Sequence, residues 1–174
     1  EVGRVGFRGG LDFDPSGERL LVASHLGTAY LLDLQRARLT GSPMPTDGRV
    51  DSGRFSADGG LIVTASEDNS AQVWDAATQA RVGAPLPHAR RVHWAGFSPN
   101  GRYVVTASAD RTARLWDVAT SRPVGFPLQH DSAVRCVQFS HDGRYLATGA
   151  LSDARVWRLP DPPATLEEIQ RLTA

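Results

Sequence analysis

Short runs of hydrophobic residues alternate with polar turns along residues 1–159. The runs are rich in β-branched and aromatic side chains, which is typical of β-strands, and the turns contain Gly, Pro, Asp and Ser. One series comprises Val92 to Phe97, Tyr103 to Ala107, Thr112 to Trp116 and Pro123 to Phe126. Since no stretch of this part keeps a helical period for more than a turn or two, the pattern predicts an all-β fold with strands in groups of four.

The pattern repeats with a period of 42 residues. A phenylalanine recurs at Phe13, Phe55, Phe97 and Phe139, each time followed by a four-residue turn that ends in glycine. A second column of the repeat contains Leu32, Trp74, Trp116 and Trp157. The glycine supplies the positive φ that a tight hairpin requires, so we expect it to be structural. A period of this length is typical of proteins in which each repeat is one small structural unit.

The period, the glycine turn and the Trp-Asp pairs at residues 74–75 and 116–117 resemble the WD-repeat β-propeller family. The resemblance covers residues 4–159 and implies a β-propeller segment of four blades, each a four-stranded antiparallel sheet. The implied repeats span residues 4–45, 46–87, 88–129 and 130–159. Members of the family typically serve as interaction surfaces, so the resemblance implies a binding role.

The C-terminal end of the repeat region departs from this plan. After Trp157 no further strand pattern follows, so we expect the last blade to lack its outer strand. Residues 160–174 are expected to form a Pro-rich linker and a short C-terminal helix, because Thr165 and Glu168 have the spacing of a capping box.

Four repeats leave the architecture of the ring open. Propellers close with four to eight blades, and the family resembled here typically has about seven. An incomplete ring exposes the apolar faces of its end blades, which is costly. We therefore expect this segment to be the C-terminal part of a larger propeller. Association of two or more copies into a ring and a closed four-blade ring are the alternatives.

The resemblance also implies a hydrogen-bonded structural tetrad of His, Ser or Thr, Asp and Trp in each blade. The third repeat has all four residue types, namely His88, Ser108 with Thr106 as the alternative, Asp110 and Trp116. The second repeat has Thr46 in place of the histidine, and the fourth has Leu151 in place of the aspartate. The first repeat is the most degenerate, with Arg4, Ser24, Leu26 and Leu32 at the four places. We therefore expect blades one and four to be looser.

Composition removes several classes of function. All 19 basic residues are arginine, and the absence of lysine excludes a Walker-type phosphate loop and Schiff-base chemistry. A formal net charge of zero argues against sequence-independent nucleic-acid binding. The apolar runs are far shorter than the roughly 20 residues of a membrane helix. The exclusive use of arginine suggests a bacterial genome rich in G and C, and nothing points away from the cytoplasm.

No catalytic or metal-binding arrangement stands out. The five histidines lack the spacing of a zinc site, and no GxSxG turn is present. The single cysteine, Cys136, cannot form an internal disulfide, and we expect it to be a small buried thiol. The sequence therefore predicts a protein that is not an enzyme and has no metal or cofactor.

The neutral total conceals two oppositely charged neighbouring repeats. Residues 39–80 have a net charge of −4, and residues 81–122 have a net charge of +5. The resemblance implies that a partner docks on the loops that enter each first strand and on those that join the second and third strands. In this chain those loops present Asp47, Arg49, Glu67, Asn69, Arg90, Arg91, Arg111 and Asp131.

The arginines of these loops suggest what the partner offers. Arg90, Arg91 and Arg111 can form a patch for an acidic motif or a phosphate, since guanidinium groups make bidentate contacts with both. The alternatives are solvated charge and pairing between blades with Glu67 and Asp68. Trp94 stands in a column of small residues and is interpreted either as extra core packing or as an aromatic anchor.

From these features we expect a non-catalytic scaffold that presents its loops to a protein or peptide partner. The alternative is a sensory or regulatory module attached to a bacterial signalling enzyme such as a Ser/Thr kinase, with catalysis outside this chain. Self-association or upstream blades would complete the ring.

Overall fold

The structure, a computed structural model, describes residues 10–159, which form fifteen β-strands in four antiparallel sheets. Blade 1 contains β1 (Leu11–Phe13), β2 (Arg19–Ser24), β3 (Thr28–Asp33) and β4 (Arg38–Pro45). Blade 2 contains β5 (Val50–Phe55), β6 (Leu61–Ser66), β7 (Ser70–Asp75) and β8 (Arg81–Pro87). Blade 3 contains β9 (Val92–Phe97), β10 (Tyr103–Ser108), β11 (Thr112–Asp117) and β12 (Arg122–Gln129). Blade 4 contains β13 (Val134–Phe139), β14 (Tyr145–Ala150) and β15 (Ala154–Arg158).

The all-β prediction is confirmed for residues 10–159, where blades 1 to 3 have four strands each and blade 4 has three, without an outer strand. In each sheet the strands lie in chain order, so every blade is a simple meander. The predicted C-terminal helix lies outside the described residues.

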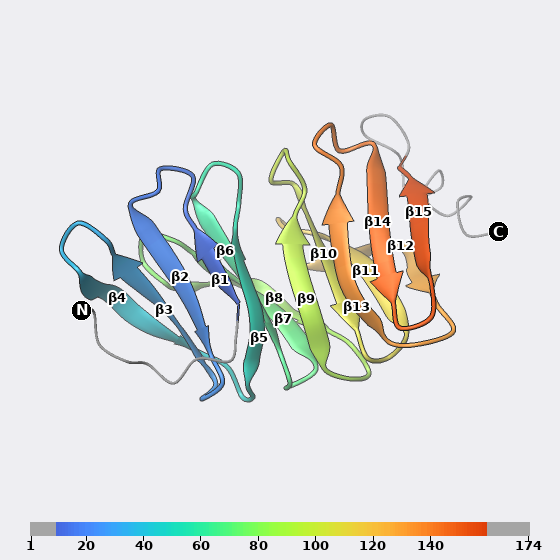
Figure 1. Cartoon of the computed structure of the whole chain (residues 1–174), viewed down its shortest axis with the longest axis horizontal. Helices are drawn as coiled ribbons and strands as arrows, with labels where there is room; N and C mark the ends of the chain where they lie inside the picture. The colour runs from blue at the N-terminus through green and yellow to red at the C-terminus, as the bar shows by residue number, and fades with distance from the viewer. Residues whose placement is uncertain (1–9, 160–174) are drawn as a thin grey trace.

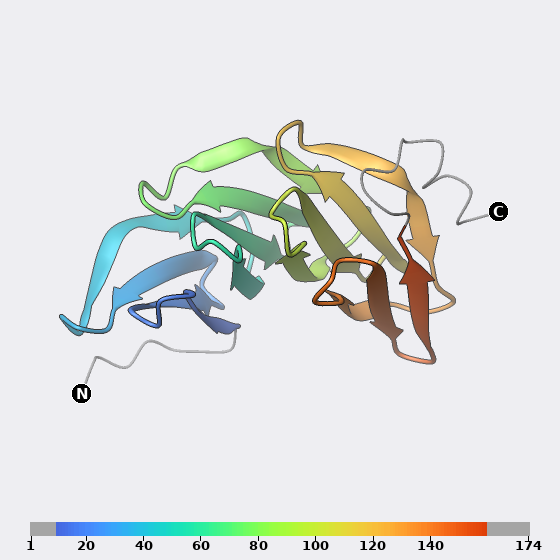
Figure 2. The same cartoon turned by 90° about the horizontal axis from the view of Figure 1, so that it is seen from above.

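The four blades form an open arc (Figures 1 and 2). The inner side of the arc is lined by the first strands of the blades, β1, β5, β9 and β13, while β4, β8 and β12 lie on its outer side. Blades 1 and 4 lie at opposite ends of the arc and do not meet, so residues 10–159 do not close a four-blade ring.

Each neighbouring pair of blades encloses its own hydrophobic core. Side chains alternate across a sheet, so each blade has one face toward the following blade, here called the front face, and one toward the preceding blade, the back face. Between blades 1 and 2, Leu31 of the front face packs with Phe55 and Trp74 of the back face. Val63 and Trp116 occupy the next core, and Leu115 and Leu146 the third. Three cores of one design therefore hold the arc together.

The glycine turns form as predicted. In blade 2, Gly59 has a φ of 70°, and the hydroxyl of Ser56 accepts a hydrogen bond from the Leu61 amide at 2.9 Å. These turns line the upper edge of Figure 1.

A side chain of one blade accepts a hydrogen bond from the outer strand of the preceding blade, and we call this contact the latch. Gln79, in the hairpin between β7 and β8, accepts a hydrogen bond from the Ser42 amide of blade 1 at 3.1 Å. A side chain at Gly41 would overlap Gln79, which is why this strand has a glycine there. Ser121 of blade 3 accepts in the same way from the Ala84 amide of blade 2.

Blade 3 contains the predicted tetrad, with one member corrected. His88 lies 2.8 Å from Asp110 through Nδ1 and 2.6 Å from the hydroxyl of Thr106 through Nε2. Trp116 Nε1 donates to the same hydroxyl at 2.9 Å. Ser108, the predicted member, donates instead to two backbone carbonyls of the preceding loop. Thr106 and Ser108 share one face of β10, but Thr106 lies closer to Trp116 along the strand.

Blade 4 has a complete tetrad as well, which corrects the expectation that Leu151 replaces its aspartate. Asp153 lies 3.1 Å from Nδ1 of His130, and Nε2 of His130 lies 2.8 Å from the hydroxyl of Thr148. Trp157 Nε1 donates to that hydroxyl at 2.9 Å. Because the turn is shorter, the aspartate lies directly before the first residue of β15. The hydrogen bonds of the tetrad are thus complete in blade 4, so they do not support the expectation of a looser blade.

Blades 1 and 2 are less complete. In blade 2, Trp74 donates to Thr64 at 2.9 Å, while Thr46 bonds to the carbonyl of Gly48 instead of joining a tetrad. Blade 1 has Val22 and Leu32 where blade 3 has Thr106 and Trp116, so this pair of polar side chains is absent there.

Candidate functional site

The loops singled out from the sequence lie together along one edge of the arc, the lower edge in Figure 1. Backbone hydrogen bonds join each loop that enters a blade to the turn beside it. The Glu67 amide donates to Arg49 at 2.9 Å, and the Ala109 amide donates to Arg91 at 3.0 Å. The His88 amide donates to Asn69 at 2.8 Å, which ties blade 3 to blade 2. This edge, here called the loop face, is therefore a continuous and well-fixed surface.

Asp51 organises a network of charges on the loop face. Its carboxylate lies 2.8 Å from Arg49 and 2.6 Å from Arg91. Glu67 completes the network, 2.9 Å from Arg91 and 3.5 Å from Arg49. Because Arg91 belongs to blade 3 and both carboxylates to blade 2, this arginine pairs between blades, as one of the sequence alternatives proposed. Its partners are Asp51 and Glu67, and not Asp68.

The network continues toward blade 4 through His93. Its Nδ1 lies 3.4 Å from Asp51, and its Nε2 lies 3.1 Å from the guanidinium of Arg135. Burial lowers the pKa of His93, and the positive charges of Arg135 and Arg91 lower it further, against the opposing effect of Asp51. A neutral His93 accepts the hydrogen bond of Arg135.

Three members of this network were not predicted from the sequence. Asp51, His93 and Arg135 follow one another at the 42-residue period, one on each first strand of blades 2 to 4. A comparison of the repeats by column would have found three polar residues at one position of a strand that lines the inner side of the arc.

Two of the predicted arginines behave differently from Arg91. The side chains of Arg90 and Arg111 are exposed, and their guanidinium groups have no hydrogen bond or ion pair within residues 10–159. Arg111 also has a φ of 71°, in the left-handed region where blade 1 has Gly27. An arginine in this conformation costs roughly 1 kcal/mol relative to glycine. Neither side chain helps to hold the described fold together.

The other predicted residues surround these two arginines. Asn69 is exposed at the corresponding turn of blade 2, also with a φ of 71°. The side chain of Asp47 is exposed, and Asp131 is 90% exposed while it pairs with Arg155 at 3.1 Å. The loop face thus has free cations on blade 3 with acidic side chains on both neighbouring blades.

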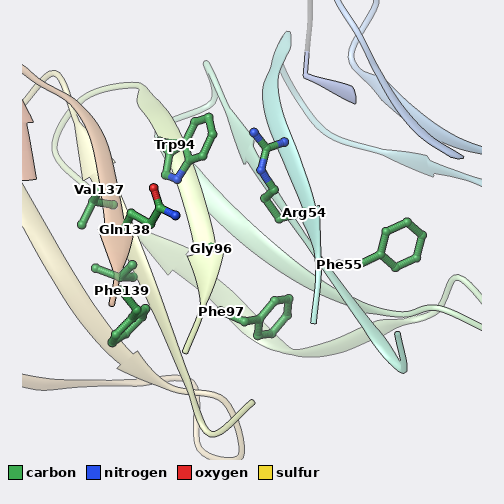
Figure 3. Close-up of a pocket in the computed structure, with 9 residues that line it drawn as sticks. Arg54, Phe55, Trp94, Gly96, Phe97, Val137, Gln138 and Phe139 are labelled. Carbon is green, nitrogen blue, oxygen red and sulfur yellow. The ribbon is translucent and has the colours of Figure 1, made fainter. Parts of the chain in front are cut away.

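Trp94 fits both interpretations offered for it. It packs against the core between blades 3 and 4 and also lines a pocket of about 330 Å³ on the inner side of the arc. Figure 3 shows Arg54 of β5 and Trp94 of β9 on either side of this pocket, with Gln138 beside the indole. The guanidinium of Arg54 stacks 4.1 Å from the ring centroid of Trp94. The indole is therefore held in place as well as half-exposed.

Cys136 occupies in blade 4 the position that Trp94 occupies in blade 3. It is exposed, so the expectation of a buried thiol is wrong. It lies on the front face of blade 4, which no other blade of the described part of the chain covers. In the part of the chain that the structure describes, no three His, Cys, Asp or Glu residues gather where they could hold a metal ion, and no helix could cross a membrane.

Comparison with known proteins agrees with this architecture. The family model described as "WD domain, G-beta repeat" matches residues 36–75, 85–117 and 122–158, which together are more than half of the chain. The structure is similar to the crystal structure of the computationally designed Ika4 protein, with a TM-score of 0.81 and 20% sequence identity over 92% of this chain and 96% of that chain. At this identity the likeness concerns the fold alone. No curated protein sequence matches the chain.

Proposed function

The chain belongs to the WD-repeat β-propeller family, and on that premise we propose that it is a non-catalytic scaffold whose loop face binds an acidic segment of a protein or peptide partner. Repeats of this family generally mediate protein–protein interaction. The proposal specifies the face, the residues and the chemistry of the partner.

The observation that carries the proposal is the pair of free arginines on blade 3. Arg111 occupies a conformation that favours glycine, yet its side chain has no partner within residues 10–159. Arg90, on the neighbouring loop, is free as well. A residue that costs stability without stabilising its own fold is often explained by binding. Guanidinium groups form paired hydrogen bonds with carboxylate or phosphate oxygens, so an acidic or phosphorylated segment suits them.

The charge network supports the same role by holding the surroundings rigid. Arg49 and Arg91 are neutralised by Asp51 and Glu67, so these four side chains fix the geometry of the loops. The free charges on blade 3 are positive, while the exposed Asp47 on the loop before blade 2 is negative, and Asp131 pairs with Arg155. A partner with acidic residues at its centre and a basic residue at the end that lies over blade 2 would match this pattern.

A peptide selection tests the proposal. Random peptides displayed on phage are selected for binding to the chain, and the affinities of the selected peptides are measured by fluorescence anisotropy. We expect an Asp- or Glu-rich consensus and at least a tenfold loss of affinity in Arg90→Glu/Arg111→Glu, since each lost contact with a charged group is worth about 1.5–3 kcal/mol. Arg122→Glu, an exposed arginine on the outer strand β12, is the matched control. A consensus without acidic residues, or equal binding by all variants, would refute the proposal.

The same face also suits the alternative setting, a sensory or regulatory module attached to a bacterial signalling enzyme. In that case the acidic segment belongs to the enzyme, and the selected consensus should recur in its sequence. Bacterial origin and a cytoplasmic location belong to this proposal and rest on the composition alone.

A further inference from the structure

The two ends of the arc each expose one apolar sheet face. Inside the arc, the front face of one blade always packs against the back face of the next. Blade 4 has no following blade within the described residues, so its front face is open. Blade 1 has no preceding blade there, so its back face is open.

The open front face of blade 4 exposes a position that is buried everywhere else. Val156 is 72% exposed, whereas its counterparts Leu31, Val73 and Leu115 are 1, 3 and 7% exposed. The side chains of β14 and β15 alternate accordingly: those on the front face are exposed or half-exposed, and those on the back face are buried, as Leu146 and Thr148 are, or half-buried. This face therefore resembles the front face of an internal interface, but no back face packs against it within residues 10–159.

The open back face of blade 1 provides that other half. Phe13 is 61% exposed, whereas its counterpart Phe55, which packs against the front face of blade 1, is 9% exposed. Leu34 and Leu39 extend the apolar surface around Leu32, which stands in the tryptophan column. Exposed contiguous apolar surfaces of this kind mark sites of association.

Polar contacts across the internal interfaces have counterparts at the ends too. Asp12 accepts a hydrogen bond from the amide of Phe55 at 2.8 Å, and Arg19 donates to two carbonyls of blade 2. The corresponding residues of blade 4 are Gln138, whose side-chain carbonyl can accept, and Tyr145, whose hydroxyl can donate. The front face of blade 4 can thus satisfy a back face in the same way.

We propose that two copies of this chain join head to tail, the front face of blade 4 of each copy packing against the back face of blade 1 of the other. One chain contains both halves of the interface, so a second copy supplies what each end lacks. Two copies make eight blades, within the four to eight with which propellers close, whereas three copies would exceed that range. A heterologous contact that closes in this way gives a ring with two identical interfaces.

Light scattering coupled to size-exclusion chromatography measures the outcome for the 174-residue chain. We expect a mass twice the 18.8 kDa of one chain. Val156→Glu should shift the mass to that of one chain and raise the dissociation constant about a hundredfold, because the carboxylate would be buried without a partner. Leu151→Glu, an equally drastic change in the 67% exposed turn of the same blade, should leave the dimer intact.

A mixing experiment separates head-to-tail closure from other modes of association. Phe13→Arg blocks the back face, so this variant alone should also have the mass of one chain. Mixing it with Val156→Glu should restore the doubled mass, because the heterodimer retains one native interface and pairs the two new charges across the other.

The proposal fails if the unmodified chain has the mass of one copy at tens of micromolar. It also fails if Val156→Glu still dimerises or if the mixture does not. Circular dichroism and thermal melting of each variant detect loss of folding. Peptide binding by the loop face uses other residues, so either proposal can fail while the other holds.

Discussion

Blade 3 and blade 1 share one strand plan but are held together in different ways. Blade 3 packs on both faces and has the chain of hydrogen bonds that joins Asp110, His88, Thr106 and Trp116. Among residues 10–159, blade 1 packs on its front face only, and it has Val22 and Leu32 where blade 3 has the threonine and the tryptophan. The meander therefore forms without a complete tetrad. The tetrad instead fixes the turn and the entering loop from which Arg90 and Arg111 project.

The largest difference between the two blades should appear at the tryptophan column. Trp116 is 2% exposed, and Trp116→Ala should reduce the free energy of unfolding by about 3–5 kcal/mol through the cavity it leaves. Leu32→Ala in blade 1 should cost only about 1 kcal/mol, because that side chain is half-exposed. Urea denaturation of both variants measures the difference. Similar losses would contradict the assignment of blade 3 as the more strongly fixed unit.

The next effect concerns the threonine. Thr106→Val gives blade 3 the residue that blade 1 has at this position, and it leaves the Trp116 donor and the facing nitrogen of His88 without a partner. We expect a loss of about 2–3 kcal/mol in urea denaturation, since an unsatisfied buried polar group costs about 1–3 kcal/mol. Thr106→Ser, which keeps the hydroxyl, should recover most of it. An unchanged stability of Thr106→Val would remove Thr106 from the tetrad.

Acid should lower the free energy of unfolding through Asp110 of blade 3. Burial raises the pKa of Asp110, but hydrogen bonds from His88 and Thr112 outweigh it and hold the pKa well below the ordinary value of 3.8. A carboxyl group with a lowered pKa in the folded state stabilises the fold above its unfolded pKa, and this contribution is lost as the pH falls through the folded pKa. Between pH 5 and pH 3 the unmodified chain should lose more stability than Asp110→Asn, by about 1 kcal/mol. Parallel urea midpoints would show that Asp110 does not titrate in this way.

The smallest effect has the opposite sign. Arg111→Gly places in blade 3 the residue type that blade 1 has at position 27. It should stabilise the fold by about 0.5–1 kcal/mol, because glycine adopts the left-handed φ of 71° without steric strain. The same variant should bind the selected acidic peptides more weakly. Gly27→Ala should destabilise blade 1. If Arg111→Gly is less stable than the unmodified chain, its side chain has a structural role.

The repeat predicted the fold because its signals are local. The period of the Phe and Trp columns, the glycine turns and the strand composition are properties of each 42-residue unit, and the unit reappears as a blade. That blade 4 has only three strands within residues 10–159 followed from the lack of any strand pattern after Trp157. Side chains that meet across blades were harder to predict, since spacing within one repeat does not say which neighbour lies opposite.

The corrections to the tetrads have a different cause, because they concern contacts within one blade. Ser108 and Thr106 lie on one face of β10, and only the position of Trp116 selects between them. Asp153 is the aspartate of blade 4, where Leu151 was expected, because one deleted residue changes which side chain reaches His130. Asp51 gathers arginines from two blades, which no single repeat reveals.

The latch on the outer strands has a consequence for how such a chain can grow. Gln79 and Ser121 each reach back to the strand before them, where a bulge with Gly41 or Gly83 makes room. Blade 2 thus has both parts of the contact, the side chain of Gln79 at one hairpin and Gly83 on its outer strand. A duplicated copy of blade 2 inserted next to its parent would find this contact matched on both sides. At the outer strands, a change in blade number by duplication would therefore need no new substitution.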